Sequence, residues 1–129
     1  MATLVDTSVW VDLFRGAPTA QVARLKALVG HEELVLGDLI FAEILQGLRT
    51  GREARQVEAA LRSYPVLELV GEATARLSAD HYRELRRRGI TVRKTIDCLI
   101  ATWCIARRVP LLHNDKDFRP FVQLGLVEA

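Results

Sequence analysis

The sequence predicts an α/β fold with three layers (α/β/α) and a central, mostly parallel sheet. Strand-like and helical segments alternate along the chain, and no hairpin signal such as Asn-Gly joins two strands. Half of the residues are hydrophobic, which is enough for a substantial core. Alternating strands and helices are typical of βαβ units, in which helices cover both faces of a parallel sheet. The 129 residues are predicted to form one domain, 1–129.

The chain begins with a strand-like segment at residues 3–6. Thr7 or Ser8 is predicted to cap the helix that follows, which ends near Gly16. Thr19 is predicted to cap a second helix. Its apolar residues recur at helical spacing and are Val22, Leu25, Leu28 and Val29.

Residues 34–36 form the second predicted strand. Asp38 is predicted to cap the next helix, which is apolar almost all round through Leu45 and polar over residues 46–51. Because a helix that is apolar on every side is normally buried, we expect this one in the interior. A further helix is predicted over 53–62. Its inward residues are Val57, Ala60 and Leu61.

A third strand is predicted at 66–70, followed by an amphipathic helix over 72–88 that ends at Gly89. The apolar residues along that helix are Ala73, Leu77, Ala79, Tyr82 and Leu85.

The last part of the chain is predicted to contain one more buried helix and one more inner strand. Thr95 is predicted to cap the helix, which runs to Arg108. The fourth strand covers 109–113, residues 117–121 suggest a helical turn or loop, and 126–127 suggest a short edge strand.

Four acidic residues occur where an ordinary core would have apolar ones. Asp6 closes the first strand, Asp115 follows the fourth, and Glu43 and Asp97 lie near the starts of two buried helices. A buried carboxylate usually becomes neutral, pairs with a cation or binds a metal. Since sites in parallel sheets form at the carboxyl ends of the strands, we expect the four acids to meet in one pocket.

Carboxylate oxygens around a small pocket favour Mg²⁺, with Mn²⁺ as a substitute. No contiguous calcium loop is visible, and the histidines, His31, His81 and His113, lack zinc-ligand spacing. A metal-loaded acidic cleft suits phosphodiester hydrolysis. Each acid alone has a structural interpretation, as a turn residue or as a first-turn helix acid; the conjunction of all four favours the metal site.

The net charge of +2 is small, but basic residues cluster in one segment. They are Arg86, Arg87, Arg88, Arg93 and Lys94. One interpretation is a patch that binds a phosphate backbone. The other is a solvated helix end whose cations are favoured by the helix dipole.

Two further features indicate the compartment. Cys98 and Cys104 lie on different faces of one helix, so they are predicted to be free, buried thiols of a reducing compartment. No apolar stretch reaches the roughly 18 residues of a membrane span, and no N-terminal signal is visible. A cytoplasmic protein with no membrane contact is therefore expected.

Taken in order, the acidic segments resemble the motifs of PIN-domain ribonucleases. Their order and spacing and the chain length resemble the VapC toxins of bacterial toxin–antitoxin pairs. The segments that carry the resemblance are Leu4–Gly16, Glu43–Arg49, Asp97–Ala101 and Asn114–Phe118. The resemblance covers essentially the whole chain.

The resemblance implies a PIN-like fold and Mg²⁺-dependent endoribonuclease activity. It implies that Asp6, Glu43, Asp97 and Asp115 are catalytic and hold the metal, with Ser8, Asn114 and Asp117 in support. It also implies a homodimer, held inactive by a VapB-type antitoxin whose tail crosses the cleft, and contact with promoter DNA only through that antitoxin.

One position departs from the pattern, and other classes of protein remain in competition. His113 stands where many relatives carry Thr or another small polar residue, which is expected to tune the fourth motif without removing an acid. A PIN-like binding module without catalysis is the main alternative. A receiver-type signalling domain needs adjacent acids after the first strand, and Asp6 has none. A dehalogenase-type phosphatase needs Asp at position 8, which is Ser.

Overall fold

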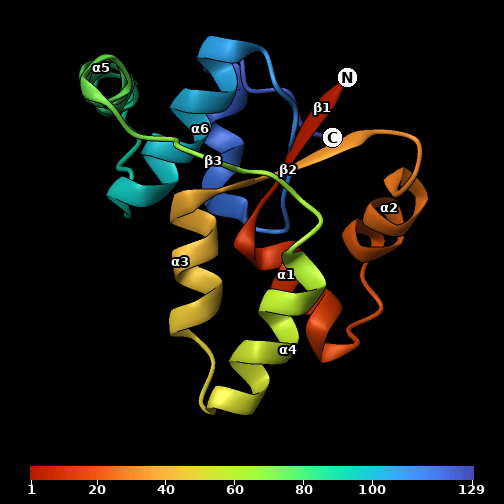
Figure 1. Ribbon diagram of the computed structural model, residues 1–129. Coiled ribbons are helices and arrows are strands. Elements are labelled where there is room, and N and C mark those ends of the chain that lie inside the picture. Colours follow the sequence, from red (N-terminus) through yellow and green to blue (C-terminus); the bar gives the residue numbers. More distant parts are fainter.

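Four parallel strands form the centre of the structure, a computed structural model that describes residues 1–129 (Figure 1). The strands lie in the order β3-β2-β1-β4. Their bounds are β1 Ala2–Val5, β2 Glu33–Gly37, β3 Val66–Leu67 and β4 Leu111–Leu112. Every pairing is parallel, with Leu4 opposite both Val35 and Leu111. The predicted parallel sheet is confirmed.

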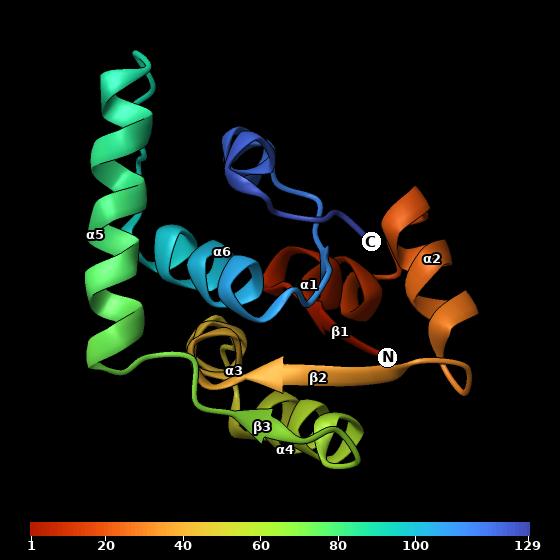
Figure 2. The same ribbon diagram turned by 90° about the horizontal axis from the view of Figure 1, so that it is seen from above.

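Helices cover both faces of the sheet, as Figure 1 shows from close to its edge. On one side lie α1 (Thr7–Arg15), α2 (Ala20–Leu28) and α4 (Gly51–Leu61). On the other side lie α6 (Thr95–Arg107) and, outside it, α5 (Glu72–Arg87). The helix α3 (Asp38–Gln46) lies at the carboxyl ends of the strands, and a 3₁₀-helix, η1 (Lys116–Leu124), packs on α6. Figure 2 shows the same arrangement from above, with the two termini near each other.

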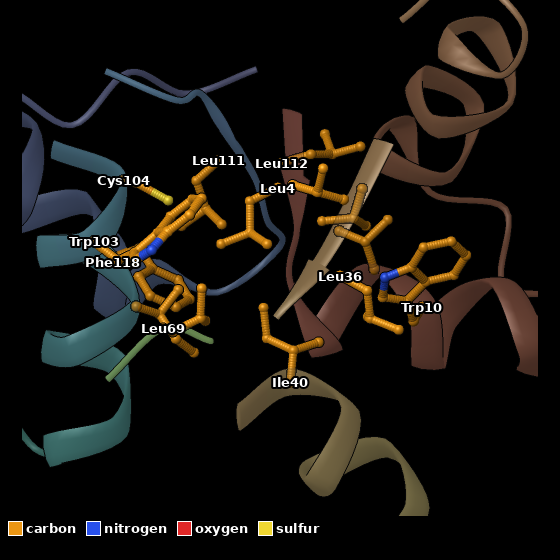
Figure 3. Close-up of a cluster of buried hydrophobic side chains, with 14 of the residues drawn as sticks. Leu4, Trp10, Leu36, Ile40, Leu69, Trp103, Cys104, Leu111, Leu112 and Phe118 are labelled. Atoms are coloured by element: carbon orange, nitrogen blue, oxygen red, sulfur yellow. The ribbon is translucent and has the colours of Figure 1, made fainter. Parts of the chain in front are cut away.

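The core extends through both faces of the sheet (Figure 3). Leu4 and Leu36, on the two central strands, are fully buried. Trp103 and Phe118 fill one side, and Trp10 fills the other. Burial of this apolar surface, at about 25 cal/mol per Å², stabilises the frame that holds the strand ends in place.

The helix α3 is less buried than its sequence predicts. Only Ile40 and Ile44 are buried, while Ala42 is exposed. The helix lies beyond the end of β2, where it packs on α1 and α4 and leaves its remaining face to solvent. The prediction of a helix buried on all sides is therefore wrong for α3. It is confirmed for α6, which buries seven residues in its middle: Asp97, Cys98, Ile100, Ala101, Thr102, Trp103 and Cys104.

Two of the predicted strands are shorter than expected. The third ends at Leu67, because the Leu69 N–H donates to the Asp38 carboxylate (3.1 Å) instead of to the sheet. The Leu69 side chain occupies the space that a Cβ at residue 37 would need, and residue 37 is a glycine. The fourth strand ends at Leu112. The edge strand predicted at 126–127 does not form; a single isolated bridge joins Leu111 to Glu128 instead.

Helix caps differ from the sequence prediction at three of four positions. Thr19 caps α2, as predicted. Asp6, rather than Thr7 or Ser8, caps α1, and its carboxylate accepts from the Ser8 N–H. Gly37 and Lys94 precede α3 and α6 without a side-chain cap, so Asp38 and Thr95 are the first helical residues.

The inner faces of several helices are also shifted. On α5 the buried residues are Thr74, Ser78 and Leu85, and the predicted Ala73 and Ala79 are exposed. Small residues allow α5 to approach α6 closely, and the Cys98 thiol donates to the Ser78 carbonyl at 3.3 Å. Val29 and Ala60 are exposed as well, because α2 and α4 each cover the core with only one narrow stripe.

Three smaller expectations have clear outcomes. Cys98 and Cys104 are both buried and free. Residues 117–121 lie within η1, so the predicted helical turn is confirmed. None of the helices combines the length and the apolar character that crossing a membrane requires.

Candidate active site

Asp6 lies at the junction of β1 and α1 and is 5% exposed. Its Oδ2 accepts from the Ser8 backbone N–H at 3.0 Å and from the Ser8 hydroxyl at 2.6 Å. Burial raises the pKa of Asp6, and these hydrogen bonds from Ser8 oppose the rise. One carboxylate oxygen is thus fixed by the start of the helix, which orients the whole group.

Ser8 also joins the first acidic motif to the fourth. Its hydroxyl oxygen accepts from the Asn114 N–H at 3.0 Å while its proton goes to Asp6. The Asn114 amide donates to Asp12 on α1 at 3.1 Å. These bonds connect residues more than one hundred positions apart and hold the loop after β4 against the start of α1.

Glu43 lies in the second turn of α3 and is partly buried. Its Oε1 accepts from the Thr7 hydroxyl at 3.0 Å. Burial raises the pKa of Glu43, and the negative charges of Asp6 and Asp115 raise it further. Glu43 therefore lies near the acids of the first and the fourth motif.

Asp97 lies in the first turn of α6 and is 6% exposed. Its Oδ2 is buried without a hydrogen-bond partner. Burial, followed by the charge of Asp6, raises the pKa of Asp97 to about 7. Asp115 and Glu43 act in the same direction. The four acids predicted to converge therefore do so at the carboxyl edge of the sheet.

Asp115 and Asp117 complete the cluster from η1. Asp115 caps that helix, and its Oδ1 accepts from the Asp117 N–H at 2.9 Å. Carboxylate oxygens of Asp97, Asp115 and Asp117 all lie within 4.8 Å of one another. Such carboxylates repel by roughly 4 kcal/mol per pair near a protein surface at 4 Å.

This geometry fits a hard divalent cation. Three carboxylates offer oxygens to one point, and the buried Asp97 Oδ2 has no protein partner. A buried polar atom without a hydrogen bond costs free energy, which a bound cation would remove. The donors are all oxygens, the ligands that Mg²⁺ and Mn²⁺ prefer. The residues present therefore form a possible acidic metal-binding cluster.

The predicted basic residues divide into two groups. Lys94 lies close enough to Asp97 and Glu43 to oppose the rise that burial causes in the pKa of each. Arg93 lines a cavity of about 190 Å³ together with Asp97, Asp117 and Lys116. Arg87 and Arg88 instead form ion pairs with Glu84 on their own helix.

Arg86 is engaged in yet another way. Its guanidinium lies over the Tyr82 ring, 5.6 Å from the centroid. It lines an apolar groove between α5 and α6, away from the acids. Of the five basic residues, the structure thus brings Arg93 and Lys94 to the acidic cluster and gives the other three partners on or beside α5.

Several residues of the site were not identified from the sequence. Thr7 holds Glu43, Asp12 holds Asn114, and Lys116 lines the cavity beside Asp97. Thr7 and Lys116 each follow one of the predicted acids directly, and that adjacency was the available signal. The pairing of Asp12 with Asn114 left no signal, because it depends on how α1 and the distant loop pack.

Comparisons with known proteins agree with this geometry. The family model of the PIN domain matches residues 3–121. The chain is 30% identical over 128 residues to "Ribonuclease VapC11" of Mycobacterium tuberculosis, covering 98% of this chain and 96% of that protein.

Two solved structures show the same fold. One is VapBC2 from Rickettsia felis bound to a DNA fragment from their promoter, with a TM-score of 0.80, 17% identity, and coverage of 100% of this chain and 98% of that chain. The other is a toxin–antitoxin complex from Klebsiella pneumoniae, with a TM-score of 0.72, 16% identity, and coverage of 98% and 96%.

Proposed function

The chain belongs to the PIN domain family, and we propose that it is a metal-dependent endoribonuclease toxin that hydrolyses RNA phosphodiester bonds. The observation that carries the proposal is the acidic cluster at the carboxyl edge of the sheet, centred on Asp97 and its unpartnered Oδ2. The relative VapC11, which aligns over nearly the whole chain, is named a ribonuclease.

We assign the catalytic and metal-binding roles to Asp6, Glu43, Asp97 and Asp115, with support from Asp117. Bound Mg²⁺, or Mn²⁺ in its place, would lower the pKa of a water molecule and neutralise charge on the scissile phosphate. Ser8 fixes the Asp6 carboxylate and, with Asn114, fixes the loop that carries Asp115.

Glu43 is the residue best suited to accept a proton from the attacking water. The Thr7 hydroxyl donates to its Oε1 and so restricts the orientation of the carboxylate. Its pKa is raised by burial, and a general base works best when its pKa approaches the working pH.

We propose that RNA approaches over the basic residues beside the acids. Arg93 and Lys116 line the cavity that also contains Asp97 and Asp117, and Lys94 lies near Glu43. Cations in these positions would pair with phosphates on either side of the scissile bond. Arg86, which lies over Tyr82, and Arg87 and Arg88, which pair with Glu84, are proposed to add little to this path. Single-stranded or looped RNA suits the site, because its backbone and bases are accessible.

The partners are proposed from the relatives. We infer neutralisation by a VapB-type antitoxin, contact with promoter DNA only through that antitoxin, and a homodimer in the cytoplasm. The similar fold in a toxin–antitoxin complex and in a promoter-bound VapBC2 complex supports the first two. An antitoxin side chain with a positive charge would be favoured at the acidic cluster, since it would compensate the same charges as the metal.

The test is cleavage of total cellular RNA by the purified protein. We expect discrete cuts with Mg²⁺, none with EDTA, and none from the Asp97→Asn variant. The ends of the products would identify the target RNA. If metal-loaded protein free of any partner makes no cuts, the catalytic proposal fails, and a PIN-like module that only binds RNA or protein becomes the better explanation.

A further inference from the structure

His113 is a buried histidine beside the acidic cluster. His113 follows β4 directly, is 8% exposed and packs on the Phe118 ring with centroids 5.0 Å apart. Phe118 is itself fully buried. The imidazole is therefore held in place by the core, and both of its nitrogens need partners.

The hydrogen bonds define which nitrogen carries the proton. The Asp115 backbone N–H donates to Nδ1 of His113 at 3.2 Å, so Nδ1 must be the unprotonated nitrogen. Nε2 then carries the proton and donates to Oε2 of Glu128 at 2.6 Å. A carboxylate on one side thus fixes the tautomer that accepts from the main chain on the other.

Glu128 is placed by the sheet. The Leu111 N–H donates to the Val127 carbonyl at 2.9 Å, and the Ala129 N–H donates to the Leu111 carbonyl at 3.0 Å. These bonds seat the end of the chain on β4, two residues before His113. The Glu128 carboxylate keeps 44% of its side-chain surface exposed, so it reaches His113 without the cost of full burial.

The line of hydrogen bonds leads to the acidic cluster. His113 accepts a hydrogen bond from the Asp115 N–H. Asp115 in turn caps η1, and Oδ1 of Asp115 accepts from the Asp117 N–H. Oxygens of both aspartates lie within 4.8 Å of an oxygen of Asp97. A change in the orientation of the residue 115 peptide would therefore move two of the three carboxylates of the group.

We propose that Glu128 is a positioning residue: through His113 it fixes the Asp115 peptide and so sets the geometry of the carboxylates that hold the metal. The inference depends on the proposed function in one respect: it takes Asp115 as a metal ligand and Asp117 as the acid that supports it. Loss of a partner behind a metal ligand typically costs about 10–100-fold in metal affinity, and that is the effect expected here.

The first measurement is the tautomer of His113. Long-range ¹H–¹⁵N NMR of the metal-free protein in mildly alkaline buffer should show a protonated Nε2 and a bare Nδ1. In Glu128→Ala we expect the other tautomer to become populated and the Asp115 amide resonance to shift. A protonated Nδ1 in the wild type would overturn the proposal.

The second measurement is the affinity for Mn²⁺, measured directly by its binding. We expect Glu128→Ala to bind Mn²⁺ about 10-fold more weakly and Glu128→Gln to retain the affinity, because the Gln carbonyl also accepts from Nε2. Glu68→Ala is the matched control, since it removes an equal charge from an exposed position beside β3. A merely structural role would lower the melting temperature of Glu128→Ala and leave its Mn²⁺ affinity unchanged.

The outcomes separate this inference from the proposed function. Equal Mn²⁺ affinity in wild type and Glu128→Ala would overturn the positioning role while leaving the metal site intact. Failure of the wild type to bind Mn²⁺ would overturn both. A wild type that binds Mn²⁺ and loses affinity in Glu128→Ala, but cuts no RNA, would support the positioning role and contradict only the nuclease.

Discussion

Two clusters of charge stand out in this chain, and the structure treats them in opposite ways. The acids at the carboxyl edge of the sheet are drawn together, Asp6 and Asp97 among them are buried, and Asp97 keeps an oxygen without a partner. The basic residues at the end of α5 are exposed, and Arg87 and Arg88 pair with Glu84. Negative charges are thus concentrated at the carboxyl edge of the sheet, whereas the positive charges at the end of α5 are neutralised by ion pairs.

This difference indicates that the acidic cluster, and not the basic one, lowers the stability of the folded protein. Exposed ion pairs on a helix contribute little to stability because water screens them, so the end of α5 is close to neutral in energy. Burial of several carboxylates is unfavourable unless a cation compensates them. A protein keeps such a cluster for chemistry, and that is why the acids rather than the arginines of α5 mark the active site.

The largest effect is expected from Asp97→Asn. This change should lower cleavage by more than the roughly 10–100-fold typical for loss of a partner behind a ligand, because Asp97 is proposed to bind the metal directly. It should also raise the melting temperature of the metal-free protein, since it removes a buried charge. RNA cleavage and thermal unfolding in EDTA measure the two effects.

The matched control is Asp80→Asn, which changes an exposed aspartate paired with Arg83 on α5. We expect near wild-type cleavage and little change in stability from it. If Asp97→Asn destabilises the metal-free protein, the acidic cluster is a structural feature, and the contrast between the two regions is lost.

The second prediction concerns pH. The pKa of Asp97 in the folded state is about 7, above the ordinary value of 3.8, and burial raises the pKa of Asp6 and Glu43 as well. Between the two values the folded state binds more protons than the unfolded state, so stability falls as pH rises through this window and levels off above it.

Thermal unfolding in EDTA should therefore give a melting temperature that rises as pH is lowered from about 8 to about 5, by roughly 4 °C for each kcal/mol gained. In Asp97→Asn the rise should be smaller. Mg²⁺ should stabilise the protein most at the upper end of this range, where the carboxylates are charged. A metal-free protein that is most stable at pH 8 would contradict the raised pKa of Asp97.

The parallel sheet and the convergence of the acids could be predicted because both depend on simple regularities. Alternating strands and helices fix the direction of the strands, and carboxyl ends of parallel strands share one edge. Asp6 and Asp115 follow β1 and β4, so their proximity needed no knowledge of packing. Glu43 and Asp97 could be placed because each interrupts an apolar segment near the start of a helix.

What could not be predicted depends on the depth and the direction of individual side chains. The sequences of α3 and α6 are similarly apolar, yet the middle of α6 is buried and α3 lies at the end of the sheet. Hydrogen bonds between distant residues, such as that of His113 with Glu128, likewise have no local signal. They arise only when β4 and the chain end pair.

A moderate effect is expected from neutralising the basic residues that lie beside the acids. Arg93→Ala and Lys94→Ala together should weaken RNA binding and raise KM, with a smaller change in kcat. For single-stranded RNA, the logarithm of the binding constant falls linearly with the logarithm of the salt concentration. Each lost phosphate contact should make that slope shallower by about 0.7. RNA affinity measured at several salt concentrations tests this. An unchanged slope would mean that neither residue contacts the backbone.

The smallest effect is expected at the end of α5, and it provides the charge-matched control. Arg87→Ala and Arg88→Ala together remove the same two charges, but both side chains already pair with Glu84, and Arg88 also donates to Gln123 at 2.9 Å. We expect at most about a twofold change in cleavage and little change in the melting temperature. The Arg87→Ala, Arg88→Ala double variant could instead weaken RNA binding as much as the Arg93→Ala, Lys94→Ala double variant does. RNA would then contact α5 as well. In that case an ion pair within a helix would not distinguish structural cations from functional ones in this protein.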